Sequence, residues 1–195
     1  MTYTLPSSIF INGQEFSIRE RGDFRMVLDC FETLNDLELP KQMRVLTTLL
    51  IFYEDFNSFE DIQKHSNDLE QLIEKMLLFF NLDQKDSGKS VNYKLIDWQQ
   101  DAPMICSAIN KVAGKEIRAE EYIHWWTFLG YYMAIGESAL STVVGIRNKI
   151  IKGKKLEKHE QEFRRENPQY FVWNSKSIEE QELDRLALEM WDAGG

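Results

Sequence analysis

The amino-acid sequence predicts a mainly α protein, a helical bundle-like structure with a small N-terminal β-hairpin. Two observations predict this fold class. From residue 23 onward, apolar residues recur at steps of three and four, which places them on one face of a helix. Before residue 23, apolar residues flank an Asn-Gly pair, which is typical of a hairpin. The chain has 195 residues, so it can bury roughly 70% of its unfolded surface and fold without a metal or a disulfide.

The hairpin is predicted over residues 8–18, "SIFINGQEFSI". The Asn-Gly pair can supply the two positive φ angles of a type I′ turn. A two-residue turn at this pair brings Ile11 opposite Gln14 and Ile9 opposite Phe16, which gathers the apolar side chains on one face. Because an isolated hairpin is marginally stable in water, we expect this face to pack on the helices that follow.

Three helices are predicted in the N-terminal half. The first begins after Asp23, where "DFRMVLDCFETL" places its apolar residues on one stripe, and the second begins after Pro40. Ser58, with Asp61 three residues later, resembles an acidic variant of the capping box. It should open a third helix that continues to Phe80.

Helices resume after a polar stretch, "NLDQKDSGKS", which breaks the periodicity. The next helix has Pro103 in its first turn and ends at Gly114. The aromatic segment 118–136 has the length and pattern of one helix. A further helix begins after Ser138, and a charged helix ends at Pro168.

These breaks predict four parts of the chain. They are an N-terminal hairpin with helices in residues 1–82, a linker in 83–91, a C-terminal helical domain in 92–172 and an acidic amphipathic tail helix in 173–195. The tail helix begins at a capping box of Ser177 and Glu180, and its apolar edge includes Met190 and Trp191. Because an isolated helix of this length is marginally stable, it docks on its own domain or on a partner, and the sequence leaves both open.

Charge is unevenly distributed along the chain. The net charge is −9, but residues 145–165 hold eight basic and three acidic residues, a local charge of +5 that leaves −14 for the rest. An acidic protein is repelled by phosphate backbones unless its basic residues are segregated, and the basic segment lacks interleaved stacking aromatics. Nucleic acid is therefore an unfavoured partner, and the basic segment is interpreted as a solvated face or as one that docks onto an acidic protein surface.

Cysteine usage and hydropathy indicate the compartment. Cys30 and Cys106 have no CxxC spacing, which is typical of reduced, cytosolic thiols. The N-terminal residues have no positive n-region, and the longest uncharged stretch, residues 122–136, is too short to cross a bilayer. These features predict a cytosolic protein without membrane contact.

The aromatic cluster "EEYIHWWTFLGYYMAIG", residues 120–136, is the first candidate for a site. Glu121 and His124 have the Glu-x-x-His spacing that puts two metal ligands on one helix face, but a carboxylate-bridged di-metal bundle needs this motif twice. No second copy occurs in a similar helical context. The favoured alternative is that Glu120 and Glu121 lie at the positive helix start and that a buried stripe follows, formed by Trp125, Phe128, Leu129 and Tyr132.

Other catalytic motifs are missing from the sequence. There is no G-x-S-x-G, neither cysteine has a histidine near it in sequence, and "DSGKS" lacks the earlier glycine and the preceding strand of a phosphate-binding loop. We therefore expect a protein that is not an enzyme, with no catalytic residues, no cofactor and no metal.

Several segments resemble one known family. "LPSSIFINGQEFSI" followed by "DFRMVLDCFETLND", then "LIDWQQDAPMICSAINKVAG", "HWWTF" and "GIR", are similar to the pattern of the bacteriophage gene product fifteen family. Ile146 in "GIR" occupies a position where the family often has an aromatic residue. The resemblance spans roughly residues 5–172. It implies a protein of phages and prophages of Gram-positive bacteria, encoded among tail morphogenesis genes near the tape-measure gene, and it carries no catalytic residues.

The resemblance implies a role in tail assembly. We expect a non-enzymatic, chaperone-like assembly factor in the host cytoplasm that binds an aggregation-prone phage tail protein, such as the tape measure or the tail-tube subunit, and homo-oligomers remain possible. The alternative is a structural tail or head–tail connector component of the virion. The residues expected in the core or in an interface are His124, Trp125, Trp126, Phe128, Arg147, Met190 and Trp191. Adjacent residues on a helix point about 100° apart, so we expect Trp125 and Trp126 to be covered by two different surfaces.

Overall fold

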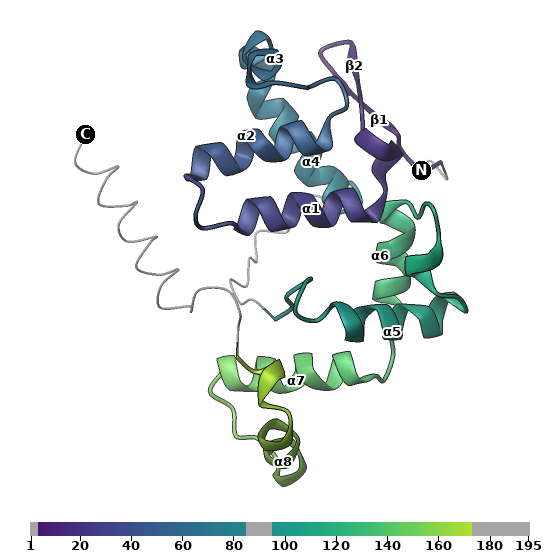
Figure 1. The fold of residues 1–195 in the computed structure, drawn as a ribbon, viewed down its shortest axis with the longest axis vertical. Helices are drawn as coiled ribbons and strands as arrows, with labels where there is room; N and C mark the ends of the chain where they lie inside the picture. Colours follow the sequence, from purple (N-terminus) through teal and green to yellow (C-terminus); the bar gives the residue numbers. More distant parts are fainter. Residues whose placement is uncertain (1–3, 85–94, 173–195) are drawn as a thin grey trace, which may run out of the picture. The chain divides into compact units, whose positions relative to one another are not determined.

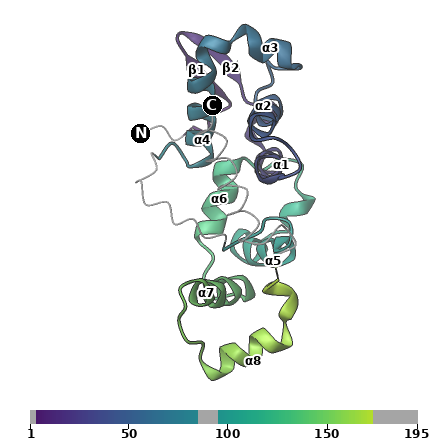
Figure 2. The ribbon, with the colours of Figure 1, turned by 90° about the vertical axis from the view of Figure 1, so that its left-hand side faces the viewer.

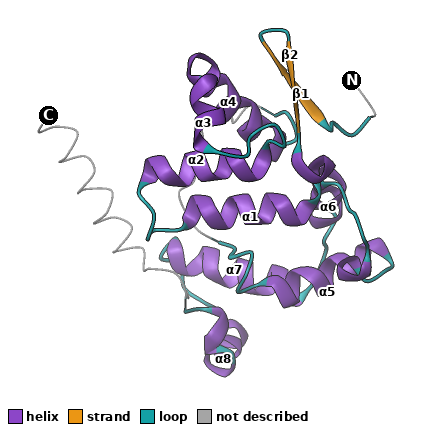
Figure 3. Cartoon of the chain, turned by 45° about the horizontal axis from the view of Figure 1, so that its top comes forward, coloured by secondary structure: helices purple, strands orange, loops and turns teal. Residues whose placement is uncertain are grey.

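The computed structural model describes residues 4–84 and 95–172 and confirms a mainly α protein with an N-terminal hairpin (Figures 1 and 3). None of the helices in these ranges is long and apolar enough to cross a bilayer. The elements are β1 (Ser8–Ile11), β2 (Gln14–Ser17), α1 (Phe24–Asn35), α2 (Lys41–Phe52), α3 (Phe59–Lys64), α4 (Leu69–Phe80), α5 (Ala102–Ala113), α6 (Trp125–Met133), α7 (Ala139–Ile151) and α8 (Lys158–Glu166).

The contacts divide the chain into two compact units that are not continuous in sequence. Among the described residues, unit 1 holds 4–84 and 109–134, and unit 2 holds 95–108 and 135–172. The helix α5 is therefore shared, and the HWWTF segment belongs to the same unit as the hairpin. The linker predicted at residues 83–91 does not indicate that residues 109–134 belong to unit 1, because long-range contacts leave no periodic signal in the sequence.

The hairpin has the predicted register. Ile11 pairs with Gln14 and Ile9 pairs with Phe16. Asn12 and Gly13 have φ angles of 50° and 86°, which are the left-handed angles that a type I′ turn requires. On the inner face Ile11, Phe16 and Ile18 are buried, and Ile9 is partly buried.

Unit 1 is built around aromatic side chains. The hairpin contacts α4, and α1 packs against α2 and α6. Phe52 contacts the rings of Phe79 and Phe80 with centroids 5.3 and 5.5 Å apart, and Phe16 lies 5.9 Å from the ring of Tyr53. The burial of apolar side chains such as these is the dominant favourable contribution to folding.

The sequence placed one helix between Ser58 and Phe80, and this prediction was wrong. Ser58 and Asp61 do form the capping box, but α3 ends at Lys64, and a 3-10 turn over Ser66–Asp68 separates it from α4. The side chains of the turn compete for backbone hydrogen bonds and disfavour a continuous helix. The ring of His65 packs 5.2 Å from that of Phe16, which fixes the break in place.

The single helix predicted over residues 118–136 was also wrong. The helix α6 begins only at Trp125, and residues before it form a short 3-10 turn and an extended segment. His124 pairs with Asp23 in an isolated β-bridge, which holds its backbone extended. Glu120 and Glu121 consequently lie outside the helix, and its first turn holds no acidic residue.

Unit 2 combines the first part of α5 with α7, α8 and the segment that follows them. The helix α7 begins at a capping box of Ser138 and Ser141, as the serine predicted. The helix α8 ends at Glu166 ahead of Pro168, in agreement with the predicted stop. Figure 2 shows the connection that leads from α7 to α8.

Candidate functional site

Two of the segments quoted from the sequence, "DFR" and "HWW", meet in unit 1. The Phe24 N–H donates to the Ile123 carbonyl over 2.9 Å. The Ile123 N–H donates over 2.9 Å to Oδ2 of Asp23, a carboxylate that is 4% exposed. Residues 22–25 and 120–126 are thus joined side by side, and we name this arrangement the clasp.

Asp23 and Arg25 close the clasp from the α1 side. Asp23 caps α1, because its Oδ1 accepts from the Arg25 N–H over 2.9 Å. The Arg25 guanidinium pairs with the same carboxylate at 3.1 Å and donates to the Glu120 carbonyl over 2.6 Å. It also lies 4.5 Å above the Phe24 ring. Burying a carboxylate costs free energy unless charged and hydrogen-bonding partners satisfy it, so the Asp23–Arg25 pair fixes both segments.

His124 caps α6 in its neutral form. Its Nδ1 accepts from the Trp126 N–H over 3.0 Å, so the proton resides on Nε2, which donates to the Pro6 carbonyl over 3.0 Å. The side chain is 2% exposed. Burial lowers the pKa of His124, outweighing the opposing effects of the Pro6 carbonyl and Asp23. Both ring nitrogens are engaged, so the imidazole could not bind a metal without giving up a hydrogen bond.

The turn that precedes Asp23 is left-handed over three residues. Glu20, Arg21 and Gly22 have φ angles of 51°, 54° and 78°, and two non-glycine residues in this region store strain. A Cβ at Gly22 would lie 2.8 Å from Cζ of Phe79 and 3.1 Å from Nε2 of His124. Only glycine fits between these rings.

The two tryptophans both reach the end of α4. The Trp125 Nε1–H donates to the Phe80 carbonyl over 3.0 Å, and the Trp126 Nε1–H donates to the Phe79 carbonyl over 2.9 Å. The last carbonyls of a helix have no partner within it, so the adjacent indoles cap α4. Trp125 is 1% exposed, whereas Trp126 is half-buried and has one side toward solvent.

The other aromatic residues of α6 extend this packing. Phe128 is 2% exposed and stacks on Phe24 with ring centroids 4.5 Å apart. Trp125 contacts Phe31 at 5.6 Å. Leu129 and Tyr132 are only partly buried. The strings "DFR" and "HWW" therefore specify packing and capping in unit 1.

The Glu-x-x-His spacing of Glu121 and His124, which the sequence disfavours as a metal site, does not lie on a helix. Glu121 and His124 precede α6, so the helical geometry that would align them is absent. Within residues 4–84 and 95–172, no three His, Cys, Asp or Glu side chains converge in a way that could hold a metal ion. The Cys30 thiol is fully buried, and burial raises its pKa, which disfavours the nucleophilic thiolate.

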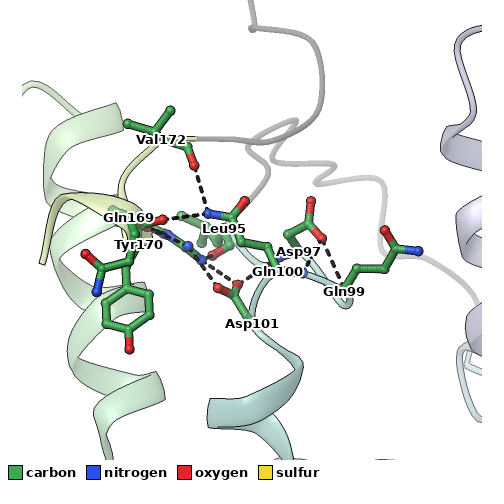
Figure 4. Close-up of polar contacts among 9 residues, drawn as sticks. Leu95, Asp97, Gln99, Gln100, Asp101, Gln169, Tyr170 and Val172 are labelled. Carbon is green, nitrogen blue, oxygen red and sulfur yellow. Dashed lines mark hydrogen bonds and ion pairs between the residues drawn. The ribbon is translucent and has the colours of Figure 1, made fainter.

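A second cluster, in unit 2, is centred on Arg147, and Figure 4 labels its partners Leu95, Asp101 and Tyr170. Its guanidinium forms a two-point ion pair with Asp101 at 2.6 and 2.9 Å. Nε and Nη2 donate to the Tyr170 carbonyl over 2.9 and 2.6 Å, and Nη1 donates to the Leu95 carbonyl over 3.0 Å. All five guanidinium N–H groups are thus used. We name these four residues the arginine hub.

The arginine hub ties together three separate segments. Arg147 is 3% exposed and Asp101 is fully buried. Gln100 adds two hydrogen bonds from Nε2, to the carbonyls of Gln169 over 2.9 Å and Val172 over 2.8 Å. The hub thus holds the backbone of residues 169–172 against the residues that precede α5, and its chemistry is structural.

The sequence left several of these residues without a role. Gly22, Asp23 and Arg25 carry the clasp, and Asp101 carries the hub. Asp23 could have been found from its position before a predicted helix, where aspartate is a favoured cap. Asp101 also directly precedes a predicted helix, but its pairing with Arg147, 46 residues away, has no signal in the sequence. Gly22 has no local signal, because the rings that exclude a Cβ there are distant in sequence. Met190 and Trp191 lie outside the described residues.

One comparison with known proteins gives a match. A family model described as bacteriophage Gp15 protein matches residues 1–171. No curated protein and no solved structure matches the chain. The matched range contains the hairpin, the clasp and the arginine hub, and it stops before the predicted tail.

Proposed function

The chain belongs to the bacteriophage Gp15 protein family, and from this premise we propose that it is a non-enzymatic phage tail assembly factor. In this proposal it binds an aggregation-prone tail protein, such as the tape measure or the tail-tube subunit, in the host cytoplasm. The clasp and the arginine hub support a binding function over catalysis, because their polar groups are committed to internal contacts.

The observation that carries the proposal is the outer edge of β1. In an antiparallel pair joined by a two-residue turn, the two residues next to the turn hydrogen-bond to each other. The backbone N–H and C=O groups of the residues one step further along each strand point away from the partner strand. The Phe10 N–H and C=O therefore point away from β2. Among the described residues, no hydrogen-bond partner covers them.

The opposite edge of the hairpin is covered. The Ser17 N–H donates to Asp55 Oδ2 over 2.7 Å, and the Ser17 carbonyl accepts from the Glu54 N–H over 3.0 Å. The exposed β1 edge also lacks the charged residues that usually protect such edges, since its sequence is "SIFI". The Phe10 side chain is 63% exposed. An extended segment of a partner could add to this edge through main-chain hydrogen bonds, with Phe10 as an apolar contact.

Co-expression pull-downs test this proposal. Each neighbouring tail protein of the same phage is tagged and co-expressed with the unaltered chain, with Phe10→Ser and with Met133→Gln. Met133 is 64% exposed in the same unit but on α6, so it is a matched control. We expect Phe10→Ser to lose capture of the tail protein at an unchanged melting temperature, while Met133→Gln retains it.

Mass spectrometry of purified virions separates the two roles in phage morphogenesis. An assembly factor leaves before maturation and should be missing from mature particles. A stoichiometric amount in the virion would instead favour the structural tail or connector role. Equal capture by the Phe10→Ser variant would contradict a role for the β1 edge.

A further inference from the structure

The connection between α7 and α8 carries a concentrated positive charge. Lys152, Lys154, Lys155 and Lys158 are all exposed, and we name them the lysine loop. The single carboxylate within this stretch, Glu157, lies 3.6 Å from Lys149, which is outside the lysine loop. Among the described residues, no carboxylate forms an ion pair with these four lysines.

The local backbone strengthens this positive potential. Lys158 is the first residue of α8, and the N-terminus of a helix adds a partial positive charge. The two carboxylates at this helix start, Glu157 and Glu160, both lie against Lys149, at 3.6 and 2.7 Å, and so are paired outside the lysine loop. The lysine loop therefore attracts a negatively charged partner, and its exposure leaves room for one.

The acidic segment that follows residue 172 begins close to the lysine loop. Phe171 contacts Phe163 of α8 with ring centroids 6.4 Å apart. Phe163 is five residues from Lys158, or about 7.5 Å along the helix axis. Hydrogen bonds from Gln100 and Arg147 to the carbonyls of Val172 and Tyr170 fix this exit point.

The composition and length of the final segment complement the lysine loop. Residues 173–195 hold six acidic and two basic residues, a net charge of −4. Glu179, Glu180 and Glu182 lie seven to ten residues past Val172, and seven extended residues span up to about 25 Å. This reach is longer than the 6.4 Å between the Phe171 and Phe163 rings and the rise of about 7.5 Å from Phe163 to Lys158 taken together. The family match ends at residue 171, so this acidic segment lies beyond the part of the chain that the family shares.

We propose that the acidic C-terminal segment, residues 177–192, binds the lysine loop of the same molecule. The contact is electrostatic, neutralises the basic part of unit 2 and makes the tail an intramolecular ligand. This inference does not depend on the tail-assembly function, because it concerns a contact within the chain.

Lysine acetylation in the full-length protein tests the contact. A nearby carboxylate keeps an amine protonated and slows its reaction with an amine-acetylating reagent, and mass spectrometry gives the rate for each lysine. In the variant E179Q/E180Q/E182Q, we expect Lys154 and Lys155 to react about two- to fivefold faster, as the loss of exposed ion pairs implies. The reference lysines Lys41 and Lys111 should not change.

A charge-matched control removes the effect of net charge. The variant E60Q/E70Q/E74Q changes three exposed carboxylates of unit 1 and should leave the lysine loop at its original rate. The acceleration should also vanish in 0.5 M NaCl, where exposed ion pairs are screened.

Three outcomes would overturn the proposal. One is an unchanged acetylation rate of the lysine loop in the tail variant. Another is carbodiimide cross-links between the lysine loop and the tail that join isotopically light to heavy chains, since these would assign the contact to a second copy. The third is protection of the lysine loop by a DNA oligonucleotide added to the unaltered protein, because an occupied loop would not be open to nucleic acid.

Discussion

Replacing Asp101 by asparagine should strongly destabilise unit 2. The carboxylate is fully buried and forms a two-point ion pair with Arg147, which is itself 3% exposed. Asp101→Asn leaves the guanidinium charge buried and places an amide N–H₂ group where an acceptor was. Removing one partner of a buried ion pair typically costs about 3–5 kcal/mol. That cost approaches the lower end of the stability of a whole domain, about 5 kcal/mol.

Hydrogen exchange measured by mass spectrometry is the appropriate assay, because it reports each unit separately. We expect peptides of α7 to exchange much faster in Asp101→Asn, while peptides of α1 in unit 1 keep their protection. The exposed pair of Arg165 and Glu162, 3.7 Å apart, provides a control, and Arg165→Gln should cause no measurable change.

A double-mutant cycle completes this experiment. If the cost arises from an unpaired buried charge, replacing Asp101 by leucine together with Arg147→Met should destabilise no more than either single replacement. The coupling free energy should then be about 3 kcal/mol or more. A cost below about 1 kcal/mol for Asp101→Asn, or additive effects of the two replacements, would refute the reasoning.

Two further predictions concern the clasp. Gly22→Ala should destabilise unit 1 by about 2–5 kcal/mol in urea unfolding, because the left-handed φ and the contact with Phe79 both oppose a Cβ. Gly13→Ala, which has a positive φ but nothing within 4 Å, should cost less, and equal costs would contradict the steric argument. Because His124 has a lowered pKa in the folded state, the unfolded chain binds the proton first, so stability should be complete above about pH 6.5 and decline as the pH falls. One proton changes the unfolding free energy by at most about 1.4 kcal/mol per pH unit. His124→Asn keeps a capping side chain and should abolish this pH dependence. A decline that persists in the variant would assign it to other groups.

Family membership acquires a physical meaning from these two clusters. The strings "DFR", "HWW" and "GIR" supply the residues that cap helices and satisfy buried charges. They therefore mark a fold, and the proposed binding function is assigned to another part of the molecule, the β1 edge. This division explains why a specific motif can identify the family without indicating a reaction.

Local chemistry made part of the fold predictable. The Asn-Gly pair determines the turn and thereby the register of the hairpin, since a two-residue turn allows one pairing. Ser138 and Pro103 mark helix starts because capping and backbone restriction act within a few residues. The sequence thus determined the fold class, most helix positions and the family.

Only the tertiary structure decided the site. The start of α6 depends on the bridge between Asp23 and His124, 101 positions apart in sequence. The partner of Arg147 lies 46 residues away, and each indole reaches a carbonyl more than 40 residues away. Such contacts have no periodicity and no fixed spacing along the chain. Their energy comes from burial and from satisfying polar groups, which are defined only once the segments meet.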